Sequence, residues 1–266
     1  MDLHLTGKRA VVTGGSQGIG KAAARQLALE GCKVVIASRT EANLQAAAAS
    51  INAEAPGSVD YVTFDARDPA SISSLFEQAA QKMGGIDILI NNAARTGRGE
   101  DDSFGSGPVD QMVQDFEEKV GGYVLCARSA APYMKKEGWG RIVNLSGGAG
   151  RMRGALLSHG TRNAAIRQVT VTMANALGPF GINVVCVSPG STLTEWGMDR
   201  DREAAEKQGK TLEQYQKDVA DKTLLKHTVT AADVADVIAF LCSPRAISLN
   251  AANFDVNGGT IREATY

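Results

Sequence analysis

The sequence lacks any block of like charge. It holds 28 Lys and Arg against 29 Asp and Glu, a formal net charge of −1, and the two signs are interspersed along all 266 residues. A protein that binds nucleic acid or an acidic membrane surface usually carries a cluster of basic side chains. We therefore expect neither nucleic acid nor a membrane among the partners of this protein.

Cysteine and histidine are scarce, and none has the spacing of a metal or redox site. The four cysteines each stand alone within or beside an apolar run, at Cys32, Cys126, Cys186 and Cys242. Zinc and redox sites need Cys or His residues a few positions apart. His4 and His227 lie far from His159 in the sequence. We expect reduced thiols in the core and no metal site.

Long apolar runs are also missing. No stretch reaches the roughly 18 apolar residues that a transmembrane helix requires. Residues 1–8 show no basic segment followed by an apolar one, so a cytoplasmic location is expected. With 44% hydrophobic residues, the chain still has enough apolar material for a substantial core.

What the sequence does contain is a glycine-rich turn at residues 13–20, Thr-Gly-Gly-Ser-Gln-Gly-Ile-Gly. It follows an apolar run at residues 9–12, typical of a strand, and precedes an amphipathic segment from Lys21, typical of a helix. Glycines let a ligand approach the backbone closely, and the N–H groups and dipole of the following helix attract an anion. We expect a pyrophosphate here, although the spacing Gly-x-x-x-Gly-x-Gly differs from the commoner fingerprint. The alternative is a tight strand-to-helix connection without a ligand.

The rest of the chain alternates short β-branched runs with segments of helical periodicity. Strands are expected at residues 34–37, 59–64, 86–90, 141–145, 183–187 and 254–256, and helices at 44–51, 72–83, 109–136, 161–177 and 230–241. Such alternation requires right-handed crossovers and a parallel sheet covered by helices on both faces. No linker interrupts it, so we expect one doubly wound α/β domain over residues 1–266.

Two segments break the alternation. Residues 95–107 are rich in Gly, Ser and charge and follow a strand, which predicts a loop at the sheet edge where such folds carry their chemistry. Residues 194–226 are polar and helix-prone, which predicts a mobile helical flap over the site. After the flap, Thr230 is expected to cap a helix, with Asp233 as its capping-box partner.

The sequence resembles the short-chain dehydrogenase/reductase family over nearly its full length. The motifs that carry the resemblance are short, but they occur in a specific order and spacing. They are Thr13-Gly14-x-x-x-Gly18-Ile19-Gly20, Asp65, Asn91-Asn92-Ala93-Ala94, Gly140-Arg141-Ile142-Val143-Asn144, Pro189-Gly190 and Val256-Asn257-Gly258-Gly259.

This resemblance implies a Rossmann-type fold that binds a nicotinamide dinucleotide, in a homotetramer or homodimer. It implies that Asp65 and Ala66 meet the adenine, that Asn91 lies near the adenosine ribose, and that Thr194 holds the nicotinamide carboxamide. The full set of expected cofactor contacts is Gly14, Ser16, Gln17, Gly18, Ile19, Gly20, Ser38, Arg39, Asp65, Ala66, Asn91, Ala93, Asn163, Pro189, Gly190, Thr192 and Thr194. Retention of the glycine turn argues against a member that has lost its cofactor.

The end of the second strand indicates which nicotinamide cofactor is bound. NAD-specific sites place an Asp or Glu there to accept hydrogen bonds from the ribose 2′-hydroxyl. This sequence has Ser38 followed by Arg39. A guanidinium binds the 2′-phosphate of NADP through charge-assisted hydrogen bonds, whereas a carboxylate repels it. We expect NADP(H) rather than NAD(H); the alternative for Arg39 is a solvated charge at a strand end.

The catalytic positions depart from the family pattern. The resemblance implies a Tyr-x-x-x-Lys pair at the start of the long helix, a Ser upstream of it and an Asn on the preceding helix. The lysine of such a pair lowers the pKa of the tyrosine and holds the nicotinamide ribose. Here His159 stands at the Tyr position, Asn163 at the Lys position and Lys119 at the Asn position. The serine is Ser146 when counted back from His159, or is replaced by Gly147 when counted from the strand.

Three interpretations of this altered site compete. In the first, the protein reduces a carbonyl with His159 as the acid, because an imidazolium of pKa about 6.5 needs no neighbouring lysine to protonate an alkoxide. In the second, hydride goes to the β-carbon of an enone or enoyl thioester, and the proton comes from water or another group. In the third, the protein binds the cofactor with little or no turnover, as a sensor or a silent subunit, and His159 has no catalytic role.

Two further hypotheses concern cations. Lys119 partly replaces the missing cation if its ammonium reaches the nicotinamide ribose or the substrate oxygen. Arg95, Arg151 and Arg153 are expected in loops at the carboxyl ends of strands, where they would steer an anionic small-molecule substrate such as a carboxylate or CoA ester. The alternative is that these arginines are simply solvated.

Overall fold

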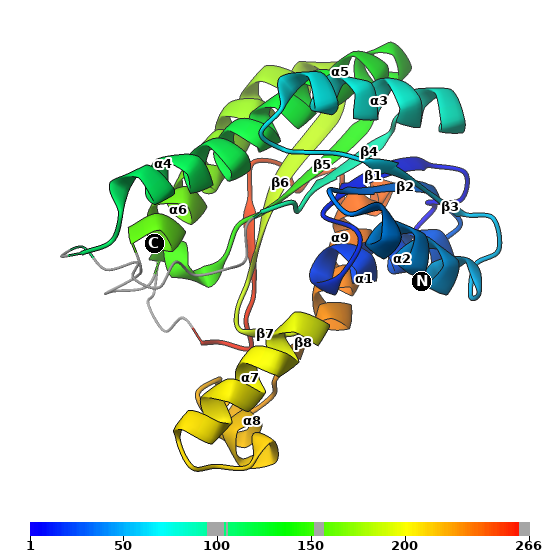
Figure 1. Cartoon of the computed structure of the whole chain (residues 1–266). Coiled ribbons are helices and arrows are strands. Elements are labelled where there is room, and N and C mark those ends of the chain that lie inside the picture. The colour runs from blue at the N-terminus through cyan, green and yellow to red at the C-terminus, as the bar shows by residue number, and fades with distance from the viewer. Residues whose placement is uncertain (95–103, 105, 152–156, 261–266) are drawn as a thin grey trace.

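A seven-stranded parallel sheet forms the centre of the molecule. The computed structural model describes residues 1–94, 104, 106–151 and 157–260. The strand order is β3-β2-β1-β4-β5-β6-β9, and all neighbours pair in parallel (Figure 1). The strands are β1 (Arg9–Thr13), β2 (Lys33–Ser38), β3 (Val59–Thr63), β4 (Ile88–Asn91), β5 (Gly140–Leu145), β6 (Ile182–Pro189) and β9 (Asn253–Val256). The chain builds outward from β1 to β3 and resumes on the other side of β1 at β4, which confirms the expected doubly wound fold.

Helices cover both faces of this sheet (Figure 1). One face carries α1 (Gly18–Leu29), α2 (Glu41–Asn52) and α9 (Ala231–Cys242); the other carries α3 (Pro69–Met83), α5 (Gly122–Glu137) and α6 (Leu157–Leu177). Before α5 lies α4 (Val109–Phe116), and short 3₁₀ turns occupy Gly148–Arg151, Gly178–Phe180 and Pro244–Ala246. Across the described ranges, no helix combines the length and the apolar character that spanning a membrane would take.

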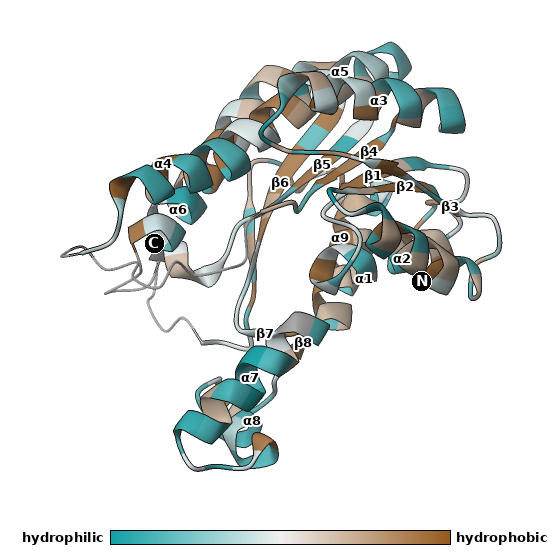
Figure 2. Cartoon of the chain, viewed as in Figure 1, coloured by the Kyte–Doolittle hydropathy of each residue, from teal (hydrophilic) through white to brown (hydrophobic). Residues whose placement is uncertain are grey.

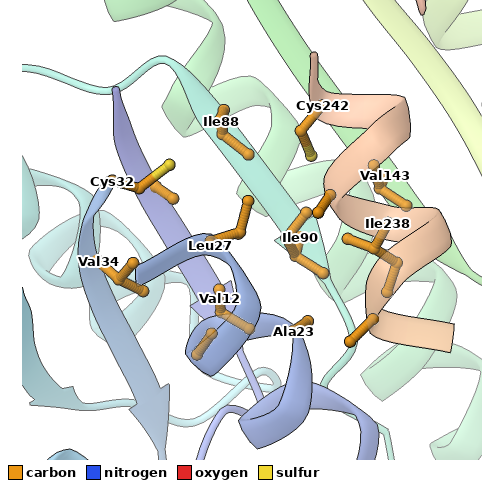
Figure 3. Packing of buried hydrophobic residues seen from close by; sticks show 14 of the residues in the cluster. Val12, Ala23, Leu27, Cys32, Val34, Ile88, Ile90, Val143, Ile238 and Cys242 are labelled. Carbon is orange, nitrogen blue, oxygen red and sulfur yellow. The ribbon is translucent and has the colours of Figure 1, made fainter. Parts of the chain in front are cut away.

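Each face of the sheet has its own apolar core. Figure 3 shows Val12, Ile90 and Val143, from the adjacent strands β1, β4 and β5, packed with Leu27 of α1 and Ile238 of α9. All of these side chains are fully buried. Strands that are covered on both faces need continuous β-branched runs rather than alternation, as these strands have. Figure 2 shows apolar strands covered by helices whose outer surfaces are hydrophilic. The four cysteines are free and buried, as expected.

The segment expected as a helix over residues 109–136 is helical throughout but contains a π turn. Glu117–Gly121 forms a π-helical turn between α4 and α5, and this turn buries Glu118, Lys119 and Val120. A π turn fits one additional residue into a helix and so changes which side chains face inward. The helix is therefore found where it was expected, but the π turn within it was not predicted, because hydrophobic periodicity over a long window does not register one extra residue.

The polar segment at residues 194–226 contains two helices, α7 (Glu195–Lys207) and α8 (Leu212–Asp221), which project from the body of the molecule (Figure 1). Two short strands bracket them, β7 (Thr192–Leu193) and β8 (Val229–Thr230), and these strands pair in parallel. The sequence predicts the helices but not this pairing, because two-residue strands have no periodicity to detect. The flap therefore leaves and rejoins the body at one place.

Threonine side chains set where two of these helices begin. The Thr230 hydroxyl accepts from the Asp233 backbone N–H at 3.2 Å, and the Asp233 carboxylate accepts from the Thr230 N–H at 2.8 Å. This confirms the predicted capping box at the start of α9. Thr194 caps α7 by accepting from the Gly197 N–H at 3.0 Å. The cap fixes the start of the flap close to the glycine turn, as described next.

Candidate functional site

A crevice of about 410 Å³ opens at the carboxyl ends of the central strands, beside the turn between β1 and α1. In doubly wound sheets ligands bind at this edge, where the strand order reverses. The predicted cofactor contacts that line it are Gly14, Ser16, Gln17, Gly18, Ile19, Ser38, Arg39, Asp65, Ala66, Ala93 and Thr194. The crevice thus brings the glycine turn, the end of β2 and the start of the flap into one site.

Two glycines of the turn leave no room for a side chain. A Cβ on Gly20 would lie 2.2 Å from the carbonyl oxygen of Gly14, and a Cβ on Gly14 would lie 2.7 Å from Asn92 Nδ2. Gly14 and Gly18 also adopt positive φ, at 67° and 55°, which favours glycine. Glycine at positions 14 and 20 therefore lets the turn pack closely against Asn92.

Asn92 holds the end of β4 against the turn, a role that sequence reasoning missed. Its Nδ2 donates to the carbonyl oxygens of Thr13 and Gly14, each at 3.1 Å. The Thr13 hydroxyl oxygen accepts from the backbone N–H groups of Asn92 and Ala93, at 3.0 and 3.1 Å. A signal existed, because Asn92 stands inside the motif at residues 91–94, but the resemblance draws attention to its neighbour Asn91.

An acidic side chain occupies the anion position of the turn. Glu195 Oε2 accepts a hydrogen bond from the Gly18 backbone N–H at 3.1 Å. Gly18 is the first residue of α1, so its N–H has no acceptor within its own helix. The N–H groups and dipole that stabilise a carboxylate there also bind phosphate. The contact therefore shows that the turn accepts an anion, and nothing in the sequence signalled Glu195.

The end of β2 offers a cation and a hydroxyl that lacks a partner. Ser38 Oγ is buried and finds no hydrogen-bond partner among the described residues. Arg39 is exposed and lines the crevice. Asp65 also lines it, but a hydrogen bond from Arg67 Nη2 to Asp65 Oδ2, at 2.9 Å, lowers the pKa of this carboxyl group. The hydrogen-bonding partner of Asp65 is thus Arg67, while the charge of Arg39 makes a smaller contribution to the same pKa shift.

The predicted catalytic residues gather where β5 ends and α6 begins. His159 lies in the first turn of α6, which begins four residues earlier than expected, and is half-buried. Ser146 follows β5, and its hydroxyl donates to the backbone carbonyl of Asn163 at 2.8 Å. A Cβ at Gly147 would lie 2.9 Å from Asn163 Nδ2. Of the two serine positions, Ser146 is bonded to α6, and Gly147 leaves its space to the Asn163 amide.

Lys119 is buried next to these residues and contacts Asn163 and Ser146. It is 5% exposed, and its Nζ donates to Asn163 Oδ1 at 2.8 Å and to the Ser146 carbonyl oxygen at 3.2 Å. Burial, with a smaller contribution from the Arg162 guanidinium, lowers the pKa of Lys119 to about 7. The amine points away from solvent and into the protein, where it contacts Asn163 and Ser146. Its role as a replacement for the missing cation stays a prediction.

A polar network ties α4 to the beginning of α6. Asp115 is buried, accepts from Ser158 Oγ at 2.6 Å and from Gln111 Nε2 at 2.9 Å, and lies 3.6 Å from Arg162 Nη1. A buried carboxylate needs such partners to offset its desolvation. Because Ser158 and Arg162 flank His159 in the sequence, this network holds the helix turn that carries the histidine.

Other predicted cofactor contacts do not line the crevice. Asn91 is fully buried and donates to Asn144 Oδ1 at 2.9 Å and to the Tyr123 carbonyl oxygen at 3.3 Å. Its side chain therefore joins β4 to β5 and α5. The remaining ones lie behind the turn, on α6, or where β6 leads into β7: Gly20, Asn163, Pro189, Gly190 and Thr192.

The arginines expected to steer an anionic substrate add no described charge to the site. Arg95 and Arg153 lie outside the described residues, as does the side chain of Arg151. A charged residue that the sequence did not signal, Glu118 of the π turn, does line the crevice. The π turn that buries Lys119 therefore also borders the space where a ligand would lie.

Comparison with known proteins agrees with this geometry. A family model described as short chain dehydrogenase matches residues 8–207. The chain is 28% identical over 257 residues to the NADPH-dependent reductase BacG of Bacillus subtilis, across 96% of this chain and 98% of that protein. It is 31% identical over 259 residues to 2,3-dihydro-2,3-dihydroxybenzoate dehydrogenase of the same organism, across 96% of each. The structure of L-sorbose reductase from Gluconobacter frateurii, complexed with NADPH and L-sorbose, matches with a TM-score of 0.92 at 29% identity, across 99% of this chain and all of that one.

These matches extend well beyond the glycine turn. The family model alone spans the chain from the residue before β1 to the end of α7. The two relatives and the solved structure match over nearly the full chain, and so include α8, β8, α9 and β9 as well. The resemblance expected from the motifs is confirmed, and the chain belongs to the short-chain dehydrogenase family.

Proposed function

We propose that the protein is an NADP(H)-dependent oxidoreductase that reduces the carbonyl group of a small molecule or oxidises the corresponding alcohol. The observation that carries the proposal is that Ser38 and Arg39 line the same crevice as the glycine turn, where an NAD-specific site would place a carboxylate. Relatives named for NADPH, the BacG reductase and L-sorbose reductase, support the choice of cofactor.

The residues that line the crevice suit the adenosine and diphosphate parts of such a cofactor. The diphosphate would take the position that the Glu195 carboxylate holds on the Gly18 N–H. The 2′-phosphate of the adenosine half would meet the Arg39 guanidinium, and the Ser38 hydroxyl, which has no partner among the described residues, would supply a further hydrogen bond. The nicotinamide half would extend past Thr194, at the base of the flap, toward the end of β5.

The contribution of the protein to the chemistry would be a proton. When bound, NADPH supplies a hydride. We propose that the His159 imidazolium donates its proton to the substrate oxygen, because imidazole is the side chain best suited to proton transfer near neutral pH. The Asp115 network would hold the helix turn that carries His159. Ser146 and Asn163, with Lys119 behind them, would form the adjoining wall of the site.

A turnover assay tests this proposal directly. NADPH is added to the purified protein, and its absorbance is followed against aldehydes, ketones and enones from pH 5 to pH 9. We expect carbonyl-dependent oxidation of NADPH that falls as pH rises through the imidazole range and is lost in His159→Ala. The matched control is His227→Ala, because His227 is exposed and pairs with Asp233 near α9.

Two other results would contradict the proposal in different ways. Turnover of enones that does not depend on His159 would favour reduction at a β-carbon. Tight binding of NADPH without oxidation by any compound would favour a sensor or a silent subunit.

Four other properties also stay predictions: a single domain over residues 1–266, a homotetramer or homodimer, an anionic substrate and a cytoplasmic location.

A further inference from the structure

Lys119 is buried at a cost that its hydrogen bonds only partly offset. Taking an ammonium out of water is unfavourable unless the charge is paired. Both acceptors of Lys119, Asn163 Oδ1 and the Ser146 carbonyl, are neutral, and no described carboxylate forms a salt bridge with it. Residues that break a packing rule in this way usually do so for function.

The lysine determines which way the Asn163 amide faces. Lys119 Nζ donates to Asn163 Oδ1, so the amide presents its oxygen to the lysine and turns its NH₂ group away. On that other side lies Gly147, where a Cβ would approach Nδ2 to 2.9 Å. Asn163 is 6% exposed, and no acceptor for Nδ2 occurs among the described residues. Asn163 Nδ2 is therefore a hydrogen-bond donor near the end of β5 that has no acceptor among the described residues.

The end of β5 is where the second half of the ligand must lie. The glycine turn takes the diphosphate, and Ser38 and Arg39 take the adenosine side, next to β2. A dinucleotide that crosses the point of strand reversal continues toward β4 and β5. Glu118, the residue before Lys119, lines the crevice and shows that the π turn borders this path.

We propose that Lys119 is a positioning residue, which holds the Asn163 amide so that Nδ2 donates to the ribose of the nicotinamide half of the cofactor. The inference deepens the proposed function and rests on the NADP(H) site. The π turn is what makes it possible, because the additional residue turns Lys119 inward from the helix that carries it. Gly147 completes the arrangement by leaving space in front of the amide.

Binding of two ligands separates this role from a general effect on folding. NADPH occupies the whole crevice, whereas adenosine 2′,5′-bisphosphate occupies only the adenosine side. In Lys119→Met we expect the Kd of NADPH to rise about tenfold, the effect of losing one buried hydrogen bond, with the Kd of the bisphosphate unchanged. Both are measured by calorimetry, and the nicotinamide emission of bound NADPH should fall in parallel.

Two further variants test the pairing of lysine and amide. Asn163→Ala should raise the Kd of NADPH as much as Lys119→Met does. The double variant should bind NADPH no more weakly than either single variant, because both changes remove the same interaction. An exchange variant, Lys119→Asn with Asn163→Lys, should recover part of the lost affinity, because it restores one ammonium and one amide. Lys136→Met, an exposed lysine on α5, is the control and should change neither Kd.

The possible failures are distinguishable. If Lys119→Met leaves NADPH binding unchanged, or weakens the binding of NADPH and of the bisphosphate equally, the positioning role is wrong, whereas the proposed NADP(H) site is not affected. Additive losses in the double variant would likewise overturn it. If the wild-type protein binds neither NADPH nor the bisphosphate, the proposed function fails, and the inference that rests on it fails as well.

Discussion

Single side chains decide which anion the crevice accepts. At the end of β2 a carboxylate would recognise a ribose hydroxyl and repel a phosphate, whereas Arg39 lines the crevice with a permanent positive charge. The nearby carboxylate of Asp65 is already bonded to Arg67. If the proposed function is right, recognition of the 2′-phosphate would depend chiefly on the Arg39 guanidinium.

Removing that guanidinium should change cofactor preference. In Arg39→Ala we expect the Kd of NADPH to rise about 10- to 100-fold, because a hydrogen bond to a charged group contributes roughly 1.5 to 3 kcal/mol. The Kd of NADH should hardly change, since NADH has no 2′-phosphate. Fluorescence titration of both cofactors measures this, with exposed Arg128→Ala on α5 as the control. Equal weakening of NADPH and NADH would show that Arg39 does not read the phosphate.

The buried lysine makes a separate prediction about stability. The pKa of Lys119 is lowered from 10.5 to about 7, so between these pH values the unfolded chain binds one more proton than the folded protein. The free energy of unfolding should therefore rise with pH in this window, by up to about 1.4 kcal/mol per pH unit. Lys119→Met lacks this contribution.

Urea denaturation of both proteins from pH 6 to pH 10 measures the difference. As pH rises above about 7, the free energy of unfolding of the wild type should increase relative to that of Lys119→Met. Tyr123 and Cys186 face the same region and are present in both proteins, so subtraction removes their titration except for the contribution of the Lys119 charge to the pKa of Cys186. A difference that does not vary with pH would mean that Lys119 is solvated.

At the scale of elements, the flap and the glycine turn share one contact region. Thr194 caps α7, and Glu195 in its first turn bonds to the first N–H of α1. A Cβ on Gly18 would touch Thr194 Cγ2 at 3.4 Å, so the two helix starts are closely packed. We predict that a diphosphate bound at the turn would displace Glu195, which would couple cofactor binding to the start of the flap.

Neutralising Glu195 should therefore strengthen cofactor binding. In Glu195→Gln we expect the Kd of NADPH to fall about two- to tenfold, because the carboxylate no longer competes with the diphosphate or repels it. The control is Glu206→Gln, an exposed residue on the same helix. Calorimetry gives the two affinities, and hydrogen exchange of α7 should increase in Glu195→Gln without ligand. Weaker binding of NADPH by this variant would contradict the competition.

At the scale of the whole molecule, the sequence predicts what depends on local pattern. The β-branched runs, the helical periodicity and the glycine turn identified the fold and the crevice, because each is specified within a few neighbouring residues. The contact between Gly18 and Glu195 joins residues 177 apart, and that between Asn92 and Gly14 joins residues 78 apart. No local pattern specifies such pairs. The inward turn of Lys119 was equally hidden, because it depends on a π turn inside a continuous helix.

The measurement that tests the account most directly is a calorimetric titration of the intact protein with NADPH and with NADH at neutral pH. The account predicts one NADPH per chain, bound at least about tenfold more tightly than NADH, because the crevice combines an anion-binding turn with Arg39 at the 2′-position. No heat with either cofactor, or NADH bound as tightly as NADPH, would contradict it.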